Sequence, residues 1–199
     1  MIMARFKELG YRPQLFLLNA ADCGVPQKRE RVFFCAVRND IDVPKLELAP
    51  THRWISAGEA TSDVQVLTDD EVKDTAPAAN DLKCWPHVKQ GGSYKDYLFV
   101  SEKRNACFGH FKTHQDKPIT TITANDSLYT HWDTCRRLTY REWKRLGSFP
   151  DDYHAKTDKI GKYMIGMSVP PKMTEQVARA VCEQWLNVNY SELSNDNQA

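Results

Sequence analysis

The sequence predicts an α/β protein that combines a few sheet elements with an irregular, loop-rich region. Two apolar segments, residues 15–20 (LFLLNA) and 31–38 (RVFFCAVR), have the length and composition of neighbouring strands. Apolar residues at helical spacing occur near both ends of the chain, whereas prolines and a glycine pair interrupt residues 39–116. Together these patterns indicate regular secondary structure at both ends and little of it in the middle.

The composition is that of a globular protein. The chain has 199 residues, of which 41% are hydrophobic and 27% charged. No segment approaches the roughly 18 apolar residues that a membrane span needs, and no signal peptide is recognised. Six scattered cysteines are typical of a reducing compartment. We therefore expect a cytoplasmic protein without a membrane partner. The net charge of +1 neither indicates nor excludes a nucleic-acid partner.

The first elements are a helix and two strands. Apolar residues fall on one face of a helix over residues 2–9, and Gly10 follows where a left-handed C-cap is favoured. About ten residues, including Gly24 and Pro26, separate the two predicted strands. This connection is too short for a crossover helix, so we expect the strands to run antiparallel.

Regular structure returns in the last third of the chain. A β-branched run occupies residues 118–124. Thr139 and Glu142 have the spacing of a capping box, which predicts a helix that Pro150 ends. A last helix begins at Pro170 and Pro171, a favoured first turn. Its apolar residues recur every fourth position at Met173, Val177, Val181 and Trp185.

The side chains of Gln27, Arg29 and Arg31 alternate where the chain leaves a turn and enters the second strand. Because side chains two residues apart in a strand share a face, these three should converge. Two guanidiniums and an amide suit phosphate oxygens, or the polar edge of a base held outside a duplex. The alternative is a solvated charged face that is paired internally through Glu30.

The middle region carries two weaker patterns. Cys84 with His87, and Cys107 with His110, have a spacing that zinc can use. We favour the alternative that these residues are isolated in a loop-rich region, and we predict no metal site. Aromatic residues interleaved with lysines between residues 85 and 111 fit either a nucleic-acid surface or a small core.

Three segments, in order, resemble the DNA (cytosine-5) methyltransferases. They are LNAADCGVPQKRERVFF at 18–34, RRLTYREWKRLGSFPDDY at 136–153 and IGMSVPP at 165–171, which resemble motifs eight, nine and ten of that family. The resemblance implies partial Rossmann-like methyltransferase sheet elements and a loop-rich target-recognition domain. The expected regions are 1–38 with motif eight, 39–135 for target recognition, 136–190 with motifs nine and ten, and a tail at 191–199.

The resemblance also implies roles for individual residues. Arg29 and Arg31 match the motif-eight arginines that help to hold the flipped cytosine and its backbone, and Gln27 stands beside them in the predicted catalytic set. Arg141 and Glu142 match the Arg-Glu pair of motif nine, which is mainly scaffolding. The residues expected to bind DNA in the recognition domain are Lys89, Gly91, Gly92 and Ser93.

Motif ten implies a cofactor contact. In the family this turn lies against the methionine part of S-adenosylmethionine. Met167 replaces the usual asparagine, which removes an amide hydrogen-bonding group. The residues expected to bind the cofactor are Gly166, Met167, Ser168 and Val169.

The family's catalytic groups are missing from this sequence. Methylation at carbon 5 needs a thiolate that adds to carbon 6, an acid near N3 and a glycine-rich cofactor turn. The family supplies them in a Pro-Cys loop, a Glu-Asn-Val segment and a Phe-x-Gly-x-Gly loop, none of which occurs here. In the family's order, all three precede motif eight.

We therefore expect the C-terminal half of a DNA (cytosine-5) methyltransferase of a restriction-modification system. It would recognise double-stranded DNA and would complete the base and S-adenosylmethionine pockets only with a complementary N-terminal subunit. Alone it is predicted to be inactive. The alternatives are a stand-alone DNA-binding module, an inactive remnant of a disrupted gene, and a zinc-dependent hydrolase that uses the Cys/His pairs.

Overall fold

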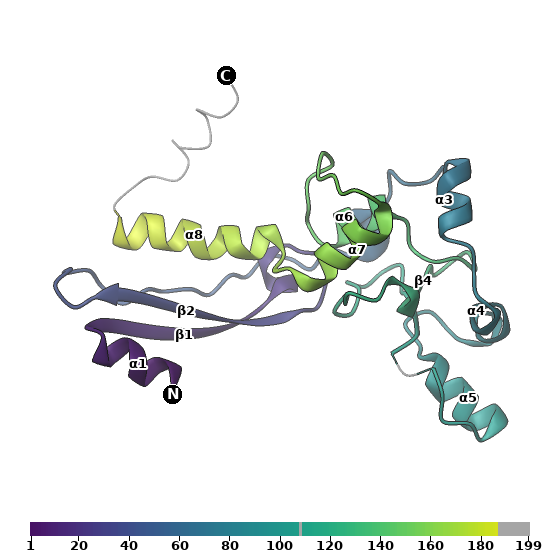
Figure 1. Ribbon diagram of the computed structural model, residues 1–199, viewed down its shortest axis with the longest axis horizontal. Coiled ribbons are helices and arrows are strands. Elements are labelled where there is room, and N and C mark those ends of the chain that lie inside the picture. The colour runs from purple at the N-terminus through teal and green to yellow at the C-terminus, as the bar shows by residue number, and fades with distance from the viewer. Residues whose placement is uncertain (108, 187–199) are drawn as a thin grey trace.

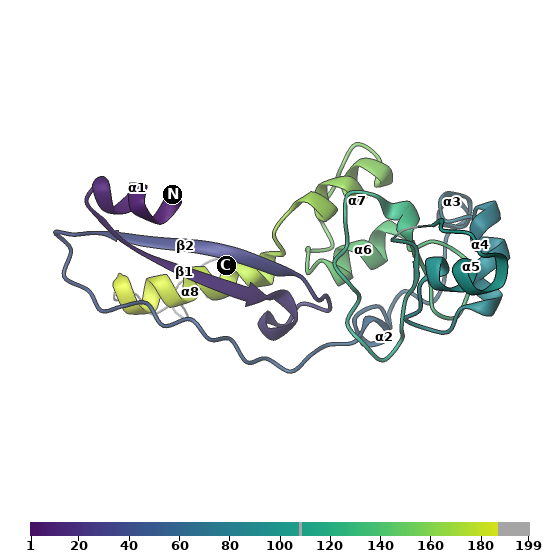
Figure 2. The ribbon, with the colours of Figure 1, turned by 90° about the horizontal axis from the view of Figure 1, so that it is seen from below.

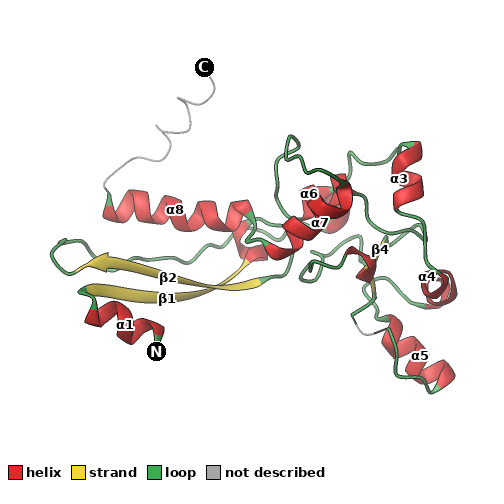
Figure 3. Ribbon diagram, in the orientation of Figure 1, coloured by secondary structure: helices red, strands yellow, loops and turns green. Residues whose placement is uncertain are grey.

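The computed structural model describes residues 1–107 and 109–186, so the predicted tail at 191–199 lies outside the described residues. A two-stranded ribbon flanked by helices forms one end of the molecule, and short helices joined by loops form the other (Figures 1 and 3). Helices α6 and α7 lie between the two ends. The expected mixture of helix and strand is therefore present, with only small sheets.

The ribbon consists of β1 (Tyr11–Asn19) and β2 (Glu30–Arg38), paired antiparallel as predicted. A short 3-10 helix, η1 (Ala20–Cys23), connects them and ends at Gly24, whose φ of +74° lies in the left-handed region. Glycine adopts this conformation without the steric cost that other residues meet. The preceding helix α1 (Ile2–Glu8) is also confirmed.

Helix α8 (Pro171–Trp185) covers one face of the ribbon, and α1 lies on the opposite side (Figure 1). The apolar residues of α8 pack within this chain. Met173 is 0% exposed and belongs to a buried cluster with Leu18 of β1, with Ala20 and Cys23 of η1, and with Val25. The apolar residues shared between the ribbon and α8 are Phe16, Leu18, Phe33, Cys35, Met173, Val177, Val181 and Trp185.

A long loop, residues 39–56, runs beside the ribbon toward the other end of the molecule (Figure 2). The Gln14 side chain fixes it by donating to the Leu46 carbonyl and accepting from the Leu46 amide, at 2.9 and 2.8 Å. The Trp185 indole donates to the Pro44 carbonyl at 3.0 Å. The loop therefore forms part of the packing around α8 and is not free in solvent.

The middle region contains more helix than its sequence indicated. Tyr94 and Leu98 of its longest helix are fully buried against Cys84 and Val88, so the aromatic residues of this region contribute to a small core. The elements are α2 (Ala57–Ala60), α3 (Asp69–Asp74), α4 (Ala79–Cys84), η2 (Trp85–His87), α5 (Tyr94–Glu102), β3 (Phe111–Lys112), η3 (Asp126–Leu128) and β4 (Tyr129–Thr130).

The β-branched run at 118–124 forms no strand of its own. It lies instead along the motif-eight turn, where the Lys28 amide donates to the Ile119 carbonyl at 2.8 Å and the Ile119 amide donates to the Pro26 carbonyl at 3.0 Å. This single bridge is too short to propagate a ladder. It joins the turn before β2 to the end of the middle region.

Helix α6 (Tyr140–Leu146) begins at the predicted capping box, with reciprocal hydrogen bonds between Thr139 and Glu142. The next helix was not predicted: α7 (Asp158–Met167) extends into the first three residues, 165–167, of the segment that we expected to be a turn. Its first turn is capped by Thr157, whose side chain accepts from the Ile160 amide. Among the described residues, no helix has the length and apolar character required to cross a membrane.

The packing of α8 gives a first prediction. Replacing fully buried Met173 by alanine should lower the free energy of unfolding by about 2 to 5 kcal/mol, because the cavity left behind adds to the lost burial. Met167→Ala is the matched control, since that side chain is 64% exposed and should change stability little. Denaturant unfolding of the three proteins measures the difference. Equal stability of both variants would show that α8 is not docked on the ribbon.

Candidate functional site

Arg29 holds motif eight and motif ten together. Its side chain is buried, and its guanidinium donates to the carbonyls of Ile122, Gly166 and Ser168 at 2.6, 3.0 and 2.8 Å. Burial, followed by the nearby charge of Arg31, lowers the pKa of Arg29 to about 10, so it stays protonated at neutral pH. Three charge-assisted bonds to backbone oxygens stabilise this buried cation.

Gln27 joins the same junction. The side chain is buried, with its amide nitrogen donating to the Leu146 carbonyl at 3.3 Å and its oxygen accepting from the Ile122 amide at 3.1 Å. Gln27 and Arg29 therefore converge as predicted, but on backbone groups of their own chain. The alternative of a solvated face is wrong for both residues, because neither is exposed.

Arg31 differs from the other two residues of the predicted set. Its side chain is half-buried, and its guanidinium donates to the carbonyl of the preceding residue, Glu30, at 2.7 Å. The expected pairing with the Glu30 carboxylate is not formed. Of the three predicted side chains, Arg31 is thus the one whose charge remains accessible to a ligand.

Gly166 lies in the last turn of α7, and not in the open turn that we expected. A Cβ atom at this position would overlap the carbonyl group of Thr123. Glycine is therefore needed here so that the helix can approach the chain's own backbone. The Ser168 hydroxyl donates to the Ile165 carbonyl at 2.8 Å, which also keeps it within the chain.

The predicted cofactor residues thus divide into two groups. Gly166 and Ser168 use their polar groups internally, whereas the side chains of Met167 and Val169 are exposed and apolar. The exposed pair fits a hydrophobic contact with the aliphatic part of a bound molecule, and does not supply a hydrogen bond. These residues would form one wall of a cofactor site.

A basic pocket lies between motif eight and the middle region of the chain. Its volume is about 250 Å³. Lys28 comes from the motif-eight turn, and Lys89, His114 and Lys117 come from loops that are distant in sequence. Among the described residues, no ion pair is formed by Lys28, Lys89 or Lys117, and all three are exposed. A concentration of unpaired cations in a hollow favours an anionic ligand.

The predicted DNA-binding segment shapes this pocket. Gly91 has a φ of +78° and its amide donates to the Lys112 carbonyl at 2.8 Å. A Cβ atom at Gly92 would come within 2.9 Å of the Lys89 carbonyl oxygen. Lys89 and Gly91 line the pocket, whereas Ser93 caps α5 by accepting from the Lys95 amide. The glycines thus permit the turn that leaves Lys89 exposed.

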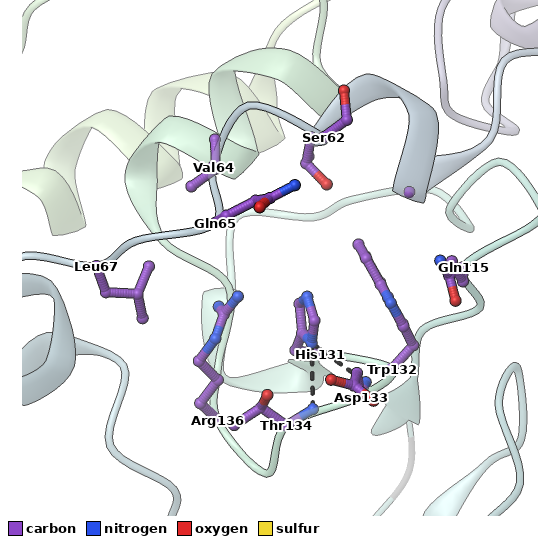
Figure 4. Close-up of a pocket in the computed structure, with 12 residues that line it drawn as sticks. Ser62, Val64, Gln65, Leu67, Gln115, His131, Trp132, Asp133, Thr134 and Arg136 are labelled. Carbon is purple, nitrogen blue, oxygen red and sulfur yellow. Dashed lines mark hydrogen bonds between the residues drawn. The ribbon is translucent and has the colours of Figure 1, made fainter.

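A larger pocket, of about 620 Å³, contains residues that the sequence did not single out (Figure 4). His131, Trp132 and Arg136 point into it from one side, and Gln65 and Ser62 lie opposite. Arg136 is paired with the buried carboxylate of Glu142 through two hydrogen bonds of 2.8 and 2.7 Å. Because its cation is neutralised in this way, this pocket suits an anion less well than the basic pocket does.

His131 is neutral within this network. Burial, followed by the charge of Arg136, lowers its pKa from 6.5 to about 4. Its Nδ1 atom accepts from the amides of Asp133 and Thr134, at 3.2 Å each. The two residues of the motif-nine Arg-Glu pair have different partners. Glu142 accepts hydrogen bonds from Arg136, and Arg141 donates to Glu71.

The Cys/His pairs of the middle region do not assemble into a ligand set. Within residues 1–107 and 109–186, no group of three or more His, Cys, Asp or Glu is placed to hold a metal ion. The ring of His87 stacks on Tyr97 with centroids 5.0 Å apart, and that of His110 stacks on Tyr94 at 6.1 Å. The described residues therefore give no support to a zinc-dependent hydrolase.

The fold is of the methyltransferase class. It superposes on a variant of Spodoptera frugiperda DNMT2 with a TM-score of 0.62 and 15% identity, over 90% of this chain and 60% of that one. The family model of the C-5 cytosine-specific DNA methylases matches residues 1–183, and the chain belongs to that family.

Curated relatives of this family are about twice as long as the matched region. The chain is 30% identical over 200 residues to the Type II methyltransferase M1.HphI of Haemophilus parahaemolyticus, covering 94% of this chain and 52% of that protein. It is 29% identical over 207 residues to M.BbvI of Brevibacillus brevis, covering 96% and 54%. The chain therefore spans about half the length of these relatives.

The Arg29 junction gives a second prediction. Arg29→Met keeps much of the side-chain volume but leaves three buried carbonyls without their donor, so the free energy of unfolding should fall by about 3 kcal/mol. Arg31→Met is the matched control and should change it by less than about 0.5 kcal/mol, because the hydrogen bond of that guanidinium is exposed to solvent. Chemical denaturation measures both. A similar loss of unfolding free energy in the two variants would contradict the conclusion that the buried hydrogen bonds of Arg29 stabilise the fold.

The pKa of His131 gives a third prediction. Because the folded protein favours the neutral ring, its stabilising contribution is complete above the unfolded pKa of 6.5 and is lost as the pH falls toward 4. The loss should amount to about 2 to 3 kcal/mol. His131→Gln should flatten the curve of unfolding free energy against pH in this window. The exposed His154→Gln serves as the control, and a curve for His131→Gln that matches the wild type would overturn the prediction.

Proposed function

We propose that this chain provides target recognition in a C-5 cytosine DNA methyltransferase of type II, and that it completes the base and S-adenosylmethionine pockets. The observation that carries the proposal is the basic pocket, in which Lys28 of motif eight lies beside Lys89 and Lys117. Double-stranded DNA presents closely spaced phosphates, and cations in such a pocket bind it by releasing counterions. The names of the relatives support the same substrate class.

The solvent exposure of each side chain indicates the role that we propose for it. Arg31 would contact the flipped cytosine or its backbone, because its guanidinium is accessible. Arg29 and Gln27 would act as positioning residues that hold motif eight against motif ten. Met167 and Val169 would line S-adenosylmethionine, which supplies the methyl group when it is bound. The nucleophilic thiolate would come from residues that this sequence does not contain.

A complementary catalytic half is supported by two exposed apolar surfaces. The ribbon face opposite α8 exposes two cross-strand pairs, Leu15 with Phe34 and Leu17 with Val32. Helix α7 exposes a second stripe at helical spacing. Contiguous apolar surface of this kind commonly marks an interface. The stripe consists of Ile160, Tyr163, Met164 and Met167.

Part of β2 is also open to a partner. Among the described residues β2 pairs only with β1, so its other edge presents free backbone N–H and C=O groups. A strand from the complementary half would satisfy them. The chain covers about half the length of its relatives, and the unmatched half is consistent with a partner of similar size.

DNA binding gives a fourth prediction. The purified chain should bind a short fluorescent duplex, with an affinity that falls steeply between about 50 and 200 mM salt. Lys28→Gln, Lys89→Gln and Lys117→Gln should each reduce the slope of log K against log salt by about one unit, because each removes one phosphate contact. Lys7→Gln, on α1 and outside the pocket, is the control and should keep the slope. Binding that does not depend on salt would refute the proposed surface.

Methyl transfer separates the alternatives. The chain alone should transfer no labelled methyl group from S-adenosylmethionine to cytosine in duplex DNA. Adding a polypeptide that carries the unmatched half of a curated relative should restore transfer, and Arg31→Ala should then lower turnover by about 10²-fold or more. Duplex binding without transfer in any such mixture would instead identify a stand-alone DNA-binding module. Methyl transfer by the chain alone would disprove the proposal that the nucleophilic thiolate comes from residues outside this sequence.

A further inference from the structure

Trp54 is a large aromatic side chain that is 48% exposed. All five tryptophans lie in the part of the chain that the structure describes, and the other four are buried or half-buried. Tryptophan is enriched at interfaces, because its large ring buries much apolar area and its N–H can meet a polar partner.

The indole is held in place by motif eight. Its Nε1 donates to the Asp22 carboxylate at 2.8 Å, and the backbone amide of His52 donates to the Asp22 carbonyl at 2.9 Å. Further along, the Ala57 amide donates to the Lys117 carbonyl at 2.9 Å. The segment that carries Trp54 is therefore fixed at both ends, which lowers the entropy lost when the ring contacts a ligand.

A cation lies against the ring. The Lys28 ammonium is 4.7 Å from the ring centroid, within cation–π range. Lys28 also lines the basic pocket, so this one side chain contacts the indole and borders the pocket. The neighbouring Arg53 does not add to this surface as a free cation, because it forms two hydrogen bonds with Glu59, at 2.5 and 2.9 Å.

We propose that Trp54 and Lys28 form a nucleotide clamp beside the basic pocket, in which the indole packs against the sugar of one nucleotide, or against its base where that base is flipped out of the duplex, and Lys28 contacts its phosphate. The inference rests on the proposed function, since it requires DNA in the basic pocket. It adds a contact that the motifs do not indicate. An exposed aromatic face next to a cation suits a nucleotide, whose flat base and charged phosphate lie a short distance apart.

The clamp assigns different effects to its two members. Trp54→Ala should weaken binding of a short duplex about tenfold without changing the salt slope, because stacking releases no counterions. Lys28→Gln should reduce the slope by about one unit. Trp54→Phe should retain most of the affinity, since it keeps an aromatic face while losing the bond to Asp22. Phe99→Ala removes another exposed aromatic side chain, on α5 and outside the pocket, and should bind as the wild type does.

Fluorescence gives an independent readout. Duplex binding should quench the emission of the exposed indole, and this quench should disappear in Trp54→Phe, which leaves four shielded tryptophans. Thermal unfolding of each variant controls for misfolding, and Trp54→Phe serves as the folded variant if Trp54→Ala is unstable. Wild-type affinity and undiminished quenching in both Trp54 variants would overturn the clamp. Salt-independent binding by the wild type would instead refute the proposed function itself.

Discussion

The structure depends on one buried cation. The Arg29 guanidinium donates to backbone oxygens of Ile122, Gly166 and Ser168, so it connects the start of β2, the end of the middle region and the junction of α7 with α8. A buried guanidinium without partners would be strongly unfavourable, and three aligned carbonyls make it stable. The geometry of these three segments is therefore coupled, and none can shift without exposing a charge to an apolar interior.

Glycine makes this junction possible. The backbone of Gly166 lies so close to Thr123 that any side chain would collide with it. The close approach places the α7 carbonyls within reach of Arg29, and it turns Met167 and Val169 outward. Residues of motif ten thus have two separate tasks. Some build the junction, and others offer an apolar wall on its outer side.

The same junction sets the distance between the two ends of the molecule. On one side, α8 and the ribbon bury a shared apolar core. On the other, the basic pocket combines Lys28 of motif eight with Lys89 and Lys117 of the middle region. Because the bridge between Lys28 and Ile119 is part of the pocket wall, rigidity at the junction fixes the positions of these cations. Preorganised charges bind an anion with less reorganisation than mobile ones do.

The sequence by itself determined the local elements. Two short apolar runs and a short connection that contains Gly24 and Pro26 predicted the antiparallel ribbon, and the Thr139 and Glu142 spacing predicted the start of α6, because such patterns depend on near neighbours only. It did not reveal α7, since the glycines and the Ser-Val-Pro-Pro ending favoured a turn and tertiary contacts overrode that preference.

Only the tertiary structure decided the use of each polar side chain. Arg29 and Arg31 are two residues apart and chemically identical, yet one is buried on three carbonyls while the other is half-buried. Likewise, nothing local indicated that Trp54 would meet Lys28 or that Glu142 would choose Arg136 over its neighbour. These partners are distant in the chain or compete with closer ones, so their selection depends on packing and desolvation, which the order of residues along one segment does not encode.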